Sequence, residues 1–392
     1  MYNLDEVIDR QGTASNKWEG RGLPKEYQGK TLCFTVADMD FATPPCIVNA
    51  LNERNAHPLF GYTHPTADLN KTFIAWQQER HNLSVDPKDI KATSGILTGM
   101  AMAIRAICQP GDKVLAYTPV YNPFFTIIEG AGCELVECPL INDDNSYQID
   151  FTQTEKYFKE GVKAVLFCNP HNPVGRVWQK DELTKLAELC LKYHVYLLSD
   201  EAHADFALFD HEYTSVYALE SIRDISVTCI SPNKTFNIAG ISIAYLLCHN
   251  QDILKKINDL LRGVWITTPS IYGMVAATAG YSQGGEWLDE VKSYLEENSR
   301  YVTAFFKDVP EIEVTKHEGT YLMWLRVSKT GSSTIIKNRL LEKGILLGDG
   351  KEYRGDGQDY LRFNIAAPKS LIIKACEGLK EVVTDFRNCG LR

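Results

Sequence analysis

The sequence predicts an α/β protein with a largely parallel sheet covered by helices, followed by a smaller α+β domain. In the middle of the chain, short apolar runs alternate with longer amphipathic stretches, a pattern typical of strand–helix–strand units. From about residue 286 the pattern changes to a long charged helix and a further helix–strand set. A chain of 392 residues also has the length of about two domains.

Five apolar runs predict strands buried on both faces, because the strands of a parallel sheet have helices on each side. The runs are Lys113–Tyr117, Val162–Cys168, Val195–Ser199, Ile225–Ile230 and Ile243–Cys248. Between the second and third runs, residues 181–194 have an acidic start and apolar residues at helical spacing, which predicts a helix.

The C-terminal third predicts a second unit. A long helix over about 286–308 precedes a strand-like run, Thr320–Arg326, and we expect this helix to act as the hinge. We therefore expect a large domain over 46–285 and a small C-terminal domain over 286–392. The N-terminal segment, 1–45, is expected to pack with the small domain.

Composition narrows the class of protein. The chain has 41 basic and 50 acidic residues and no basic block, so a nucleic-acid partner is not expected. The N-terminus lacks the apolar core of a signal peptide, and no window approaches the roughly 18 apolar residues of a membrane helix. The 11 cysteines are scattered without a CxxC pair, which predicts buried reduced thiols rather than disulfides or a metal site. These features indicate a cytoplasmic protein.

Ligands of open α/β sheets bind beyond the carboxyl ends of the strands, and four predicted strand exits carry chemically suitable residues. At the first exit, the backbone of Gly95, Ile96 and Leu97 opens a helix, which suits a phosphate; the alternative is that Ser94 is only a helix N-cap. At the second exit, two Asn-Pro pairs hold the amide of Asn172; the alternative is simple turn chemistry.

The third exit places Asp200 at the end of an apolar strand. A buried carboxylate needs a cation or several hydrogen bonds, although an N-cap role is the alternative. His203 would project near it if a helix begins there. At the fourth exit, Lys234 lies in the loop SPNKTFNIAG. Desolvation or a nearby cation would lower its pKa and suit it to bind a carbonyl covalently; the alternative is a surface charge.

One cofactor accounts for all four exits. A phosphate site, a positioned amide, a buried carboxylate and an activated lysine together describe a site for pyridoxal 5′-phosphate.

The order of the segments SGILTG, YNPF, NPHNPVG, SDEAH and SPNKTFNIAG resembles the fold-type-I pyridoxal-phosphate enzymes of the class I/II aminotransferase superfamily, over nearly the whole chain. More narrowly, VADMDF (36–41), GYTHP (61–65) and CNPHNPVGRVW resemble the cystathionine β-lyase and cysteine-S-conjugate β-lyase branch. The resemblance implies a mainly parallel, seven-stranded type of sheet sandwiched by helices in the large domain.

The resemblance also implies roles for the residues that bind the cofactor. Lys234 would bind it covalently and move the Cα proton, and Asp200 would pair with the pyridinium nitrogen. Asn172 and His203 would lie near the phenolic oxygen, and Tyr121 would stack on the ring. The phosphate would be held by a further set, namely Gly95, Ile96, Leu97, Ser231 and, from the partner subunit of a homodimer with shared active sites, Tyr62.

For the substrate, the resemblance implies that Arg362 clamps the α-carboxylate, with Ala37 and Asn172 beside it. The alternative for Arg362 is a surface salt bridge. Many aminotransferases carry a phosphate-binding arginine eight residues after the lysine, where this chain has Ser242. Fewer cationic groups are therefore expected around the phosphate, which suits the lyase branch.

The implied reaction is β-elimination from an L-cysteine thioether, such as L-cystathionine, to a thiol, pyruvate and ammonia. Tyr121 is the candidate donor of a proton to the leaving sulfur. Two alternatives stay open at this point: an aminotransferase with the same cofactor and fold, and a lyase with an added regulatory binding role.

Overall fold

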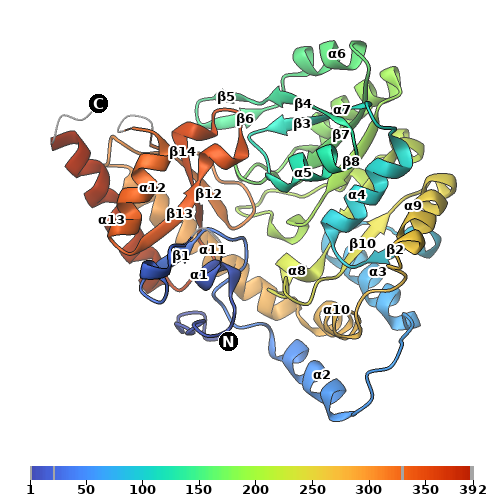
Figure 1. The fold of residues 1–392 in the computed structure, drawn as a ribbon, viewed down its shortest axis with the longest axis horizontal. Coiled ribbons are helices and arrows are strands. Elements are labelled where there is room, and N and C mark those ends of the chain that lie inside the picture. The colour runs from blue at the N-terminus through green and yellow to red at the C-terminus, as the bar shows by residue number, and fades with distance from the viewer. Residues whose placement is uncertain (1, 21–22, 328–330, 389–392) are drawn as a thin grey trace.

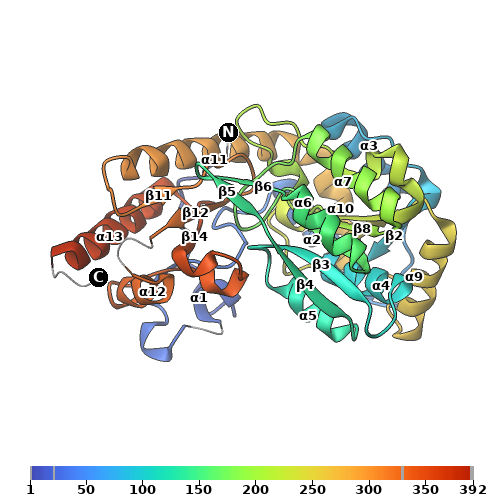
Figure 2. The same cartoon turned by 90° about the horizontal axis from the view of Figure 1, so that it is seen from above.

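The computed structural model describes residues 2–20, 23–327 and 331–388. It contains two principal sheets, one of seven strands and one of five, and a two-stranded hairpin. Helix α11 (Gly285–Phe306) extends from the smaller sheet towards the larger one (Figures 1 and 2). The fold-type-I prediction is confirmed.

The seven-stranded sheet has the order β2-β10-β9-β8-β7-β3-β4, and only β10 runs against its neighbours. All five predicted strands are present, and no end is shifted by more than one residue. The strands are β2 (Ile90–Thr93), β3 (Lys113–Thr118), β4 (Glu134–Pro139), β7 (Val162–Cys168), β8 (Tyr196–Asp200), β9 (Ser226–Ile230) and β10 (Ala244–Leu247).

Alternate side chains of these strands enter two different cores. Val114 and Ala116 pack with helices on one face, whereas Leu115 and Tyr117 pack on the other. On the first face lie α4 (Ile96–Ile107), α5 (Pro123–Gly130) and α9 (Gln251–Gly263). On the second lie α6 (Phe151–Lys159) and α7 (Lys180–Tyr193), the helix predicted over 181–194. The remaining helices of this part are α2 (Pro45–Ala56), α3 (Ala67–His81), α8 (Pro232–Thr235) and α10 (Ile271–Gln283).

The five-stranded sheet has the order β1-β13-β14-β12-β11. Strand β1 from the N-terminal segment pairs in parallel with β13, with Leu32 opposite Ile345. The division at residues 45 and 285 stays a proposal, which this pairing supports. The elements are β1 (Leu32–Phe34), β11 (Glu313–Val314), β12 (Leu322–Arg326), β13 (Ile345–Asp349), β14 (Tyr360–Asn364), α1 (Asn16–Glu19), α12 (Ser333–Glu342) and α13 (Lys369–Asn388), and the separate hairpin is β5 (Ile141–Asp143) with β6 (Ser146–Gln148).

The turn after β7 connects the two parts of the molecule. Gly175 has a φ of +75°, and its carbonyl accepts the backbone N–H groups of Glu318 and Gly319, both at 2.9 Å. The next residue, Arg176, is buried and forms ion pairs with buried Glu318 and with partly exposed Glu182, the latter at 2.7 Å. The turn at the end of a central strand is therefore fixed from both sides.

Two further properties concern the described ranges. Ten cysteines there are free, nine of them buried, as the sequence predicts, while Cys389 lies outside these ranges. No helix in the same ranges is sufficiently long and apolar for a membrane span, and no group of three or more His, Cys, Asp or Glu side chains could hold a metal ion.

Replacing Gly175 with alanine should destabilise the protein strongly. A Cβ there would lie 2.7 Å from Cδ2 of His317, and the positive φ adds backbone strain. We expect a loss of about 2–4 kcal/mol in the free energy of unfolding, measured by urea titration. Gly161→Ala is the matched control, since Gly161 has a φ of +90° but no atom within 4 Å of the added Cβ. It should lose only about 1 kcal/mol, and equal losses would contradict the proposed clash.

Candidate active site

The four strand exits meet at one cavity at the carboxyl edge of the seven-stranded sheet. The structure brings ten of the twelve predicted site residues to its wall, and the two others are Tyr62 and Arg362. The cavity has a volume of about 290 Å³. The ten are Ala37, Gly95, Ile96, Leu97, Tyr121, Asn172, Asp200, His203, Ser231 and Lys234.

Lys234 lies in the short helix α8 and is half-buried in the cavity wall. Its Nζ donates a hydrogen bond to the carbonyl of Ala37 at 2.5 Å. Burial, assisted by Arg362, lowers the pKa of this lysine to about 8, against the opposing effects of Asp38 and Asp200. The surface-charge alternative is wrong because the amine lies at the cavity wall and donates to a backbone carbonyl, and about a tenth of it is neutral at pH 7.

Asp200 ends β8 and is 4% exposed. Burial raises the pKa of its carboxyl to about 6, although the Ala202 N–H, at 3.0 Å, and the charge of Lys234 both favour ionisation. The N-cap alternative is wrong because the next helical turn, Ala204–Phe206, has His203 at its N-cap position. Among the described residues no cation forms an ion pair with Asp200, so its carboxylate fits a cationic ring nitrogen.

Arg362 projects from β14 and is 5% exposed. Its Nη1 donates to Oδ1 of Asn172 at 3.0 Å, its Nη2 donates to the carbonyl of Thr35, and its guanidinium lies 4.9 Å from the centre of the Tyr353 ring. The surface-salt-bridge alternative is therefore wrong. Its Nε is buried without a hydrogen-bond partner in the described part of the chain.

His203 is buried against the ring of Tyr321, with ring centres 5.3 Å apart. Burial, Lys234 and Arg362 together hold its pKa well below the usual range, so the imidazole is neutral. Within the described ranges its Nδ1 has no hydrogen-bond partner either. Unpaired buried polar atoms are unfavourable, and both Arg362 Nε and His203 Nδ1 therefore call for a ligand.

One end of the cavity, where the sequence predicts the phosphate site, is formed by the start of α4. Gly95, not Ser94, occupies the N-cap position, and no side chain caps the helix, so the N-cap alternative for Ser94 is wrong. The first backbone N–H groups of α4 suit an anion. A Cβ at Gly95 would lie 3.1 Å from Oγ of Ser242, whose hydroxyl donates to the Ser94 carbonyl.

Ser231 lines the cavity, but its hydroxyl already has two partners. It donates to the carbonyl of Ile243 at 2.7 Å and accepts the N–H of Asn233 at 3.0 Å, which caps α8. Its contact with a phosphate stays a prediction.

Tyr62 lies away from the cavity and is fully exposed, as are large parts of Leu59 and Phe60. Its predicted contact from a partner subunit is not tested by a single chain.

Sequence reasoning missed the groups that hold Lys234 and its helix. Buried Asp205 accepts hydrogen bonds from Trp76 Nε1 at 2.9 Å and from the hydroxyl of Thr235, next to the lysine, at 2.6 Å. His81 contacts the same carboxylate at 2.8 Å. Asp205 follows the SDEAH segment closely, and this position was a signal that the sequence offered. Trp76 and His81 lie about 130 residues earlier, in α3, where no sequence pattern pointed to them.

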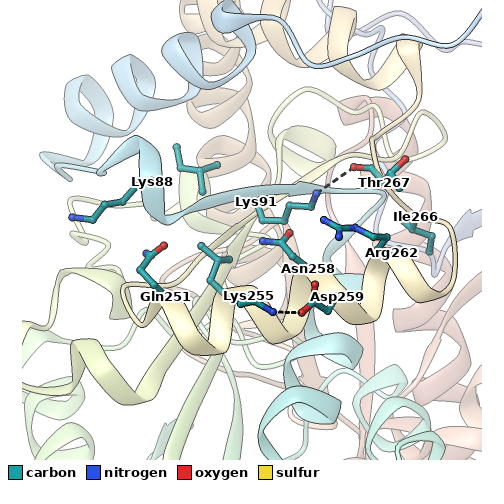
Figure 3. A pocket seen from close by; sticks show the side chains of 11 residues that line it. Lys88, Lys91, Gln251, Lys255, Asn258, Asp259, Arg262, Ile266 and Thr267 are labelled. Carbon is teal, nitrogen blue, oxygen red and sulfur yellow. Dashed lines mark hydrogen bonds and ion pairs between the residues drawn. The ribbon is translucent and has the colours of Figure 1, made fainter.

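A second cavity of about 520 Å³ lies between β2 and α9 and contains none of the predicted site residues (Figure 3). Lys91 and Arg262 point into it, and Nζ of Lys91 donates to the Thr267 carbonyl at 3.2 Å. Lys255, beside them, pairs with Asp259 at 2.6 Å. The predicted site residues gather instead at the cavity at the strand exits.

The fold and the cavity define a fold-type-I pyridoxal-phosphate enzyme. The chain belongs to the aminotransferase class I and II family, whose model matches residues 30–379. It is 38% identical to cystathionine beta-lyase PatB of Bacillus subtilis strain 168, over 92% of this chain and 95% of that protein.

Two solved structures are similar over 98% of this chain. Cystalysin from Treponema denticola, which contains pyridoxal 5′-phosphate, has 34% identity and a TM-score of 0.94 over 99% of its chain. A pyridoxal-phosphate-bound C–S lyase from Staphylococcus hominis has 30% identity and a TM-score of 0.90 over 98% of its chain. The predicted family is confirmed.

Asp200→Asn should change the pH dependence of stability in the cofactor-free chain. The unfolded carboxyl loses its proton near pH 4 and the folded one near pH 6, so Asp200 destabilises the fold increasingly across this interval and fully above it. Relative to the wild type, the variant should gain roughly 2–3 kcal/mol between pH 4 and 7, measured by urea unfolding. A difference that does not vary with pH would contradict the raised pKa.

Proposed function

We propose that the protein is a pyridoxal-phosphate-dependent carbon–sulfur β-lyase that acts on L-cysteine thioethers such as L-cystathionine. The observation that carries the proposal is the meeting of Lys234 and Asp200 at one cavity, with Arg362 hydrogen-bonded to Asn172 in its wall. The proposal is also supported by the 38% identity of this chain to a protein named cystathionine beta-lyase. The products would be a thiol, pyruvate and ammonia, a reaction of sulfur amino acid metabolism.

The cavity residues fit the cofactor. Asp200 would hold the ring nitrogen, Tyr121 would stack on the ring, and Asn172 and His203 would face the phenolic oxygen. The backbone at the start of α4, with Ser231, would hold the phosphate. Pyridoxal phosphate, when bound, supplies an electron-withdrawing ring that stabilises negative charge at the substrate Cα.

The chain itself supplies the substrate contacts and the proton transfers. Arg362 would bind the α-carboxylate in two-pronged fashion, next to Ala37 and Asn172, and so orient the Cα–H bond. The Lys234 amine would take the Cα proton, which requires its neutral form; a pKa of about 8 makes this form available near neutral pH.

Tyr121 would give a proton to the departing sulfur. Burial and the nearby Asp200 raise the pKa of its hydroxyl, so the tyrosine carries its proton at neutral pH. Its backbone N–H donates to the Asn172 carbonyl at 3.1 Å, which ties the tyrosine to the turn after β7.

We also propose a cytoplasmic homodimer with shared active sites. Five exposed apolar or aromatic side chains on two segments support a covered surface. They are Leu59, Phe60, Tyr62, Val264 and Trp265. Tyr62 would reach the phosphate in the partner's cavity. The free cysteines support a reducing compartment.

The second candidate is an aminotransferase, which the family name itself favours. Both reactions begin with removal of the Cα proton by Lys234. They differ in the next step, because a lyase loses the β-substituent, whereas an aminotransferase requires a 2-oxo acid as acceptor. A regulatory binding role has no specific observation in its favour.

Pyruvate release from L-cystathionine without any 2-oxo acid tests the proposal. A lyase should form thiol and pyruvate in equal amounts over many turnovers. Lys234→Ala should lower this rate by a factor on the order of 10³ and remove the near-visible absorbance of lysine-bound cofactor. Turnover that requires a 2-oxo acid would favour the aminotransferase, and pyruvate release by Lys234→Ala at a comparable rate would refute the role of the lysine.

Mixed dimers test the sharing of active sites. Tyr62→Ala and Lys234→Ala chains should each have little activity at limiting cofactor, but their hybrid contains one site with both native residues and should regain lyase activity. The matched control combines Lys234→Ala with Arg362→Ala, two defects expected on the same side of the site. No recovery is expected there, and equal behaviour of the two hybrids would argue against a contribution of Tyr62 from the partner.

A further inference from the structure

The carbonyl oxygen of Ala37 accepts hydrogen bonds from two side chains, one in α8 and one immediately before β12. Nζ of Lys234 donates to it at 2.5 Å, and the hydroxyl of Tyr321 donates to it at 2.8 Å. A carbonyl oxygen has two lone pairs, so these two donors saturate it. The lysine and the tyrosine therefore share one acceptor.

Tyr321 is built to keep this contact. It is fully buried immediately before β12, and its ring packs edge-on against His203 at 5.3 Å and Phe206 at 5.1 Å between ring centres. Its backbone carbonyl accepts the N–H of Ile365 at 2.9 Å. Among the described residues, the hydroxyl of Tyr321 has the Ala37 carbonyl as its hydrogen-bond partner.

The Ala37 carbonyl is equally immobile. The amide of Asn364 donates to the carbonyls on both sides of it, those of Val36 and Asp38, at 2.7 Å each. The N–H of Met39 donates to Oδ1 of Asn237 at 2.9 Å. These hydrogen bonds fix the orientation of the Ala37 carbonyl, so it keeps the same direction when the lysine leaves.

We propose that Tyr321 is a positioning residue that releases Lys234 from the Ala37 carbonyl. This inference rests on the proposed function and deepens it, because binding the cofactor requires the lysine nitrogen to leave this carbonyl. A buried carbonyl without a donor is unfavourable, and Tyr321 remains as a donor after the lysine has gone. The shared contact also makes the carbonyl a weaker acceptor for the ammonium form and so favours the neutral amine.

Several charged groups act on the pKa of Lys234 besides the hydrogen bond at Ala37. Asp38 in the N-terminal segment and Asp200 on β8 raise the pKa of the lysine, Arg362 on β14 lowers it, and neutral His203 lies on the same side. Burial raises the pKa of the Tyr321 hydroxyl well above its usual value, so the hydroxyl keeps its proton and can donate it to the Ala37 carbonyl. Tyr321→Phe therefore removes one hydrogen bond and no charge.

The experiment measures the pKa of Lys234 in the full-length, cofactor-free chain. The rate of acetylation of this lysine by acetic anhydride is followed against pH by mass spectrometry, in the wild type and in Tyr321→Phe. We expect the pKa to rise by roughly half to one unit, which slows acetylation at pH 7 about three- to tenfold. Pyridoxal phosphate, added by titration, should bind roughly tenfold more weakly to the variant.

Tyr245→Phe is the matched control, since Tyr245 is also fully buried and donates its hydroxyl to a backbone carbonyl, that of Leu69 at 3.4 Å, away from the lysine. It should leave the acetylation profile unchanged. An unchanged profile in Tyr321→Phe, with wild-type thermal stability, would overturn the proposal, and so would equal shifts in both variants. Neither readout requires turnover, so a failure of the lyase assignment is distinguishable from a failure of this inference.

Discussion

The removal of two opposite charges from water at one edge of the sheet is the constraint on which the site depends. Burial lowers the pKa of Lys234 to about 8 and raises that of Asp200 to about 6, so both groups are pushed towards their neutral forms. Neither charge is neutralised by direct pairing with the other in the described structure. The cavity is thus prepared for a ligand that offers an electrophilic carbonyl to the amine and a cationic nitrogen to the carboxylate.

Around these two groups, hydrogen bonds from distant parts of the chain fix the geometry. Asp205 accepts a hydrogen bond from Thr235, the residue after the lysine. Asn364 fixes the backbone on both sides of Ala37. Arg362 reaches Asn172 from the smaller sheet. Asp205, Asn364 and Arg362 are all buried, and these hydrogen bonds keep the site in one arrangement.

The sequence was most informative where burial leaves a pattern. The central strands read as apolar runs and were predicted to within one residue, and the residues at their exits were found for the same reason. Strands β2 and β4 were missed because they lie at the edges of the sheet and carry Lys91, Glu134 and Glu137, which interrupt an apolar run. Tyr321, Asp205 and Asn364 were missed because their roles depend on contacts with residues 30 to 328 positions away, which no local pattern records.

The parallel pairing of β1 with β13 has a consequence for biosynthesis. Leu32 leaves the ribosome early, but its partner Ile345 is made more than 300 residues later, and Asn364, which fixes the backbone around Ala37, later still. Strand β1 therefore stays unpaired while the strands of the seven-stranded sheet are made. Its pairing with β13 closes a loop of more than 300 residues, which is slow. The wall of the cavity that meets the lysine amine is translated before the seven-stranded sheet, but its backbone is fixed only after residue 364 has been made, so a nascent chain cannot complete its site before then.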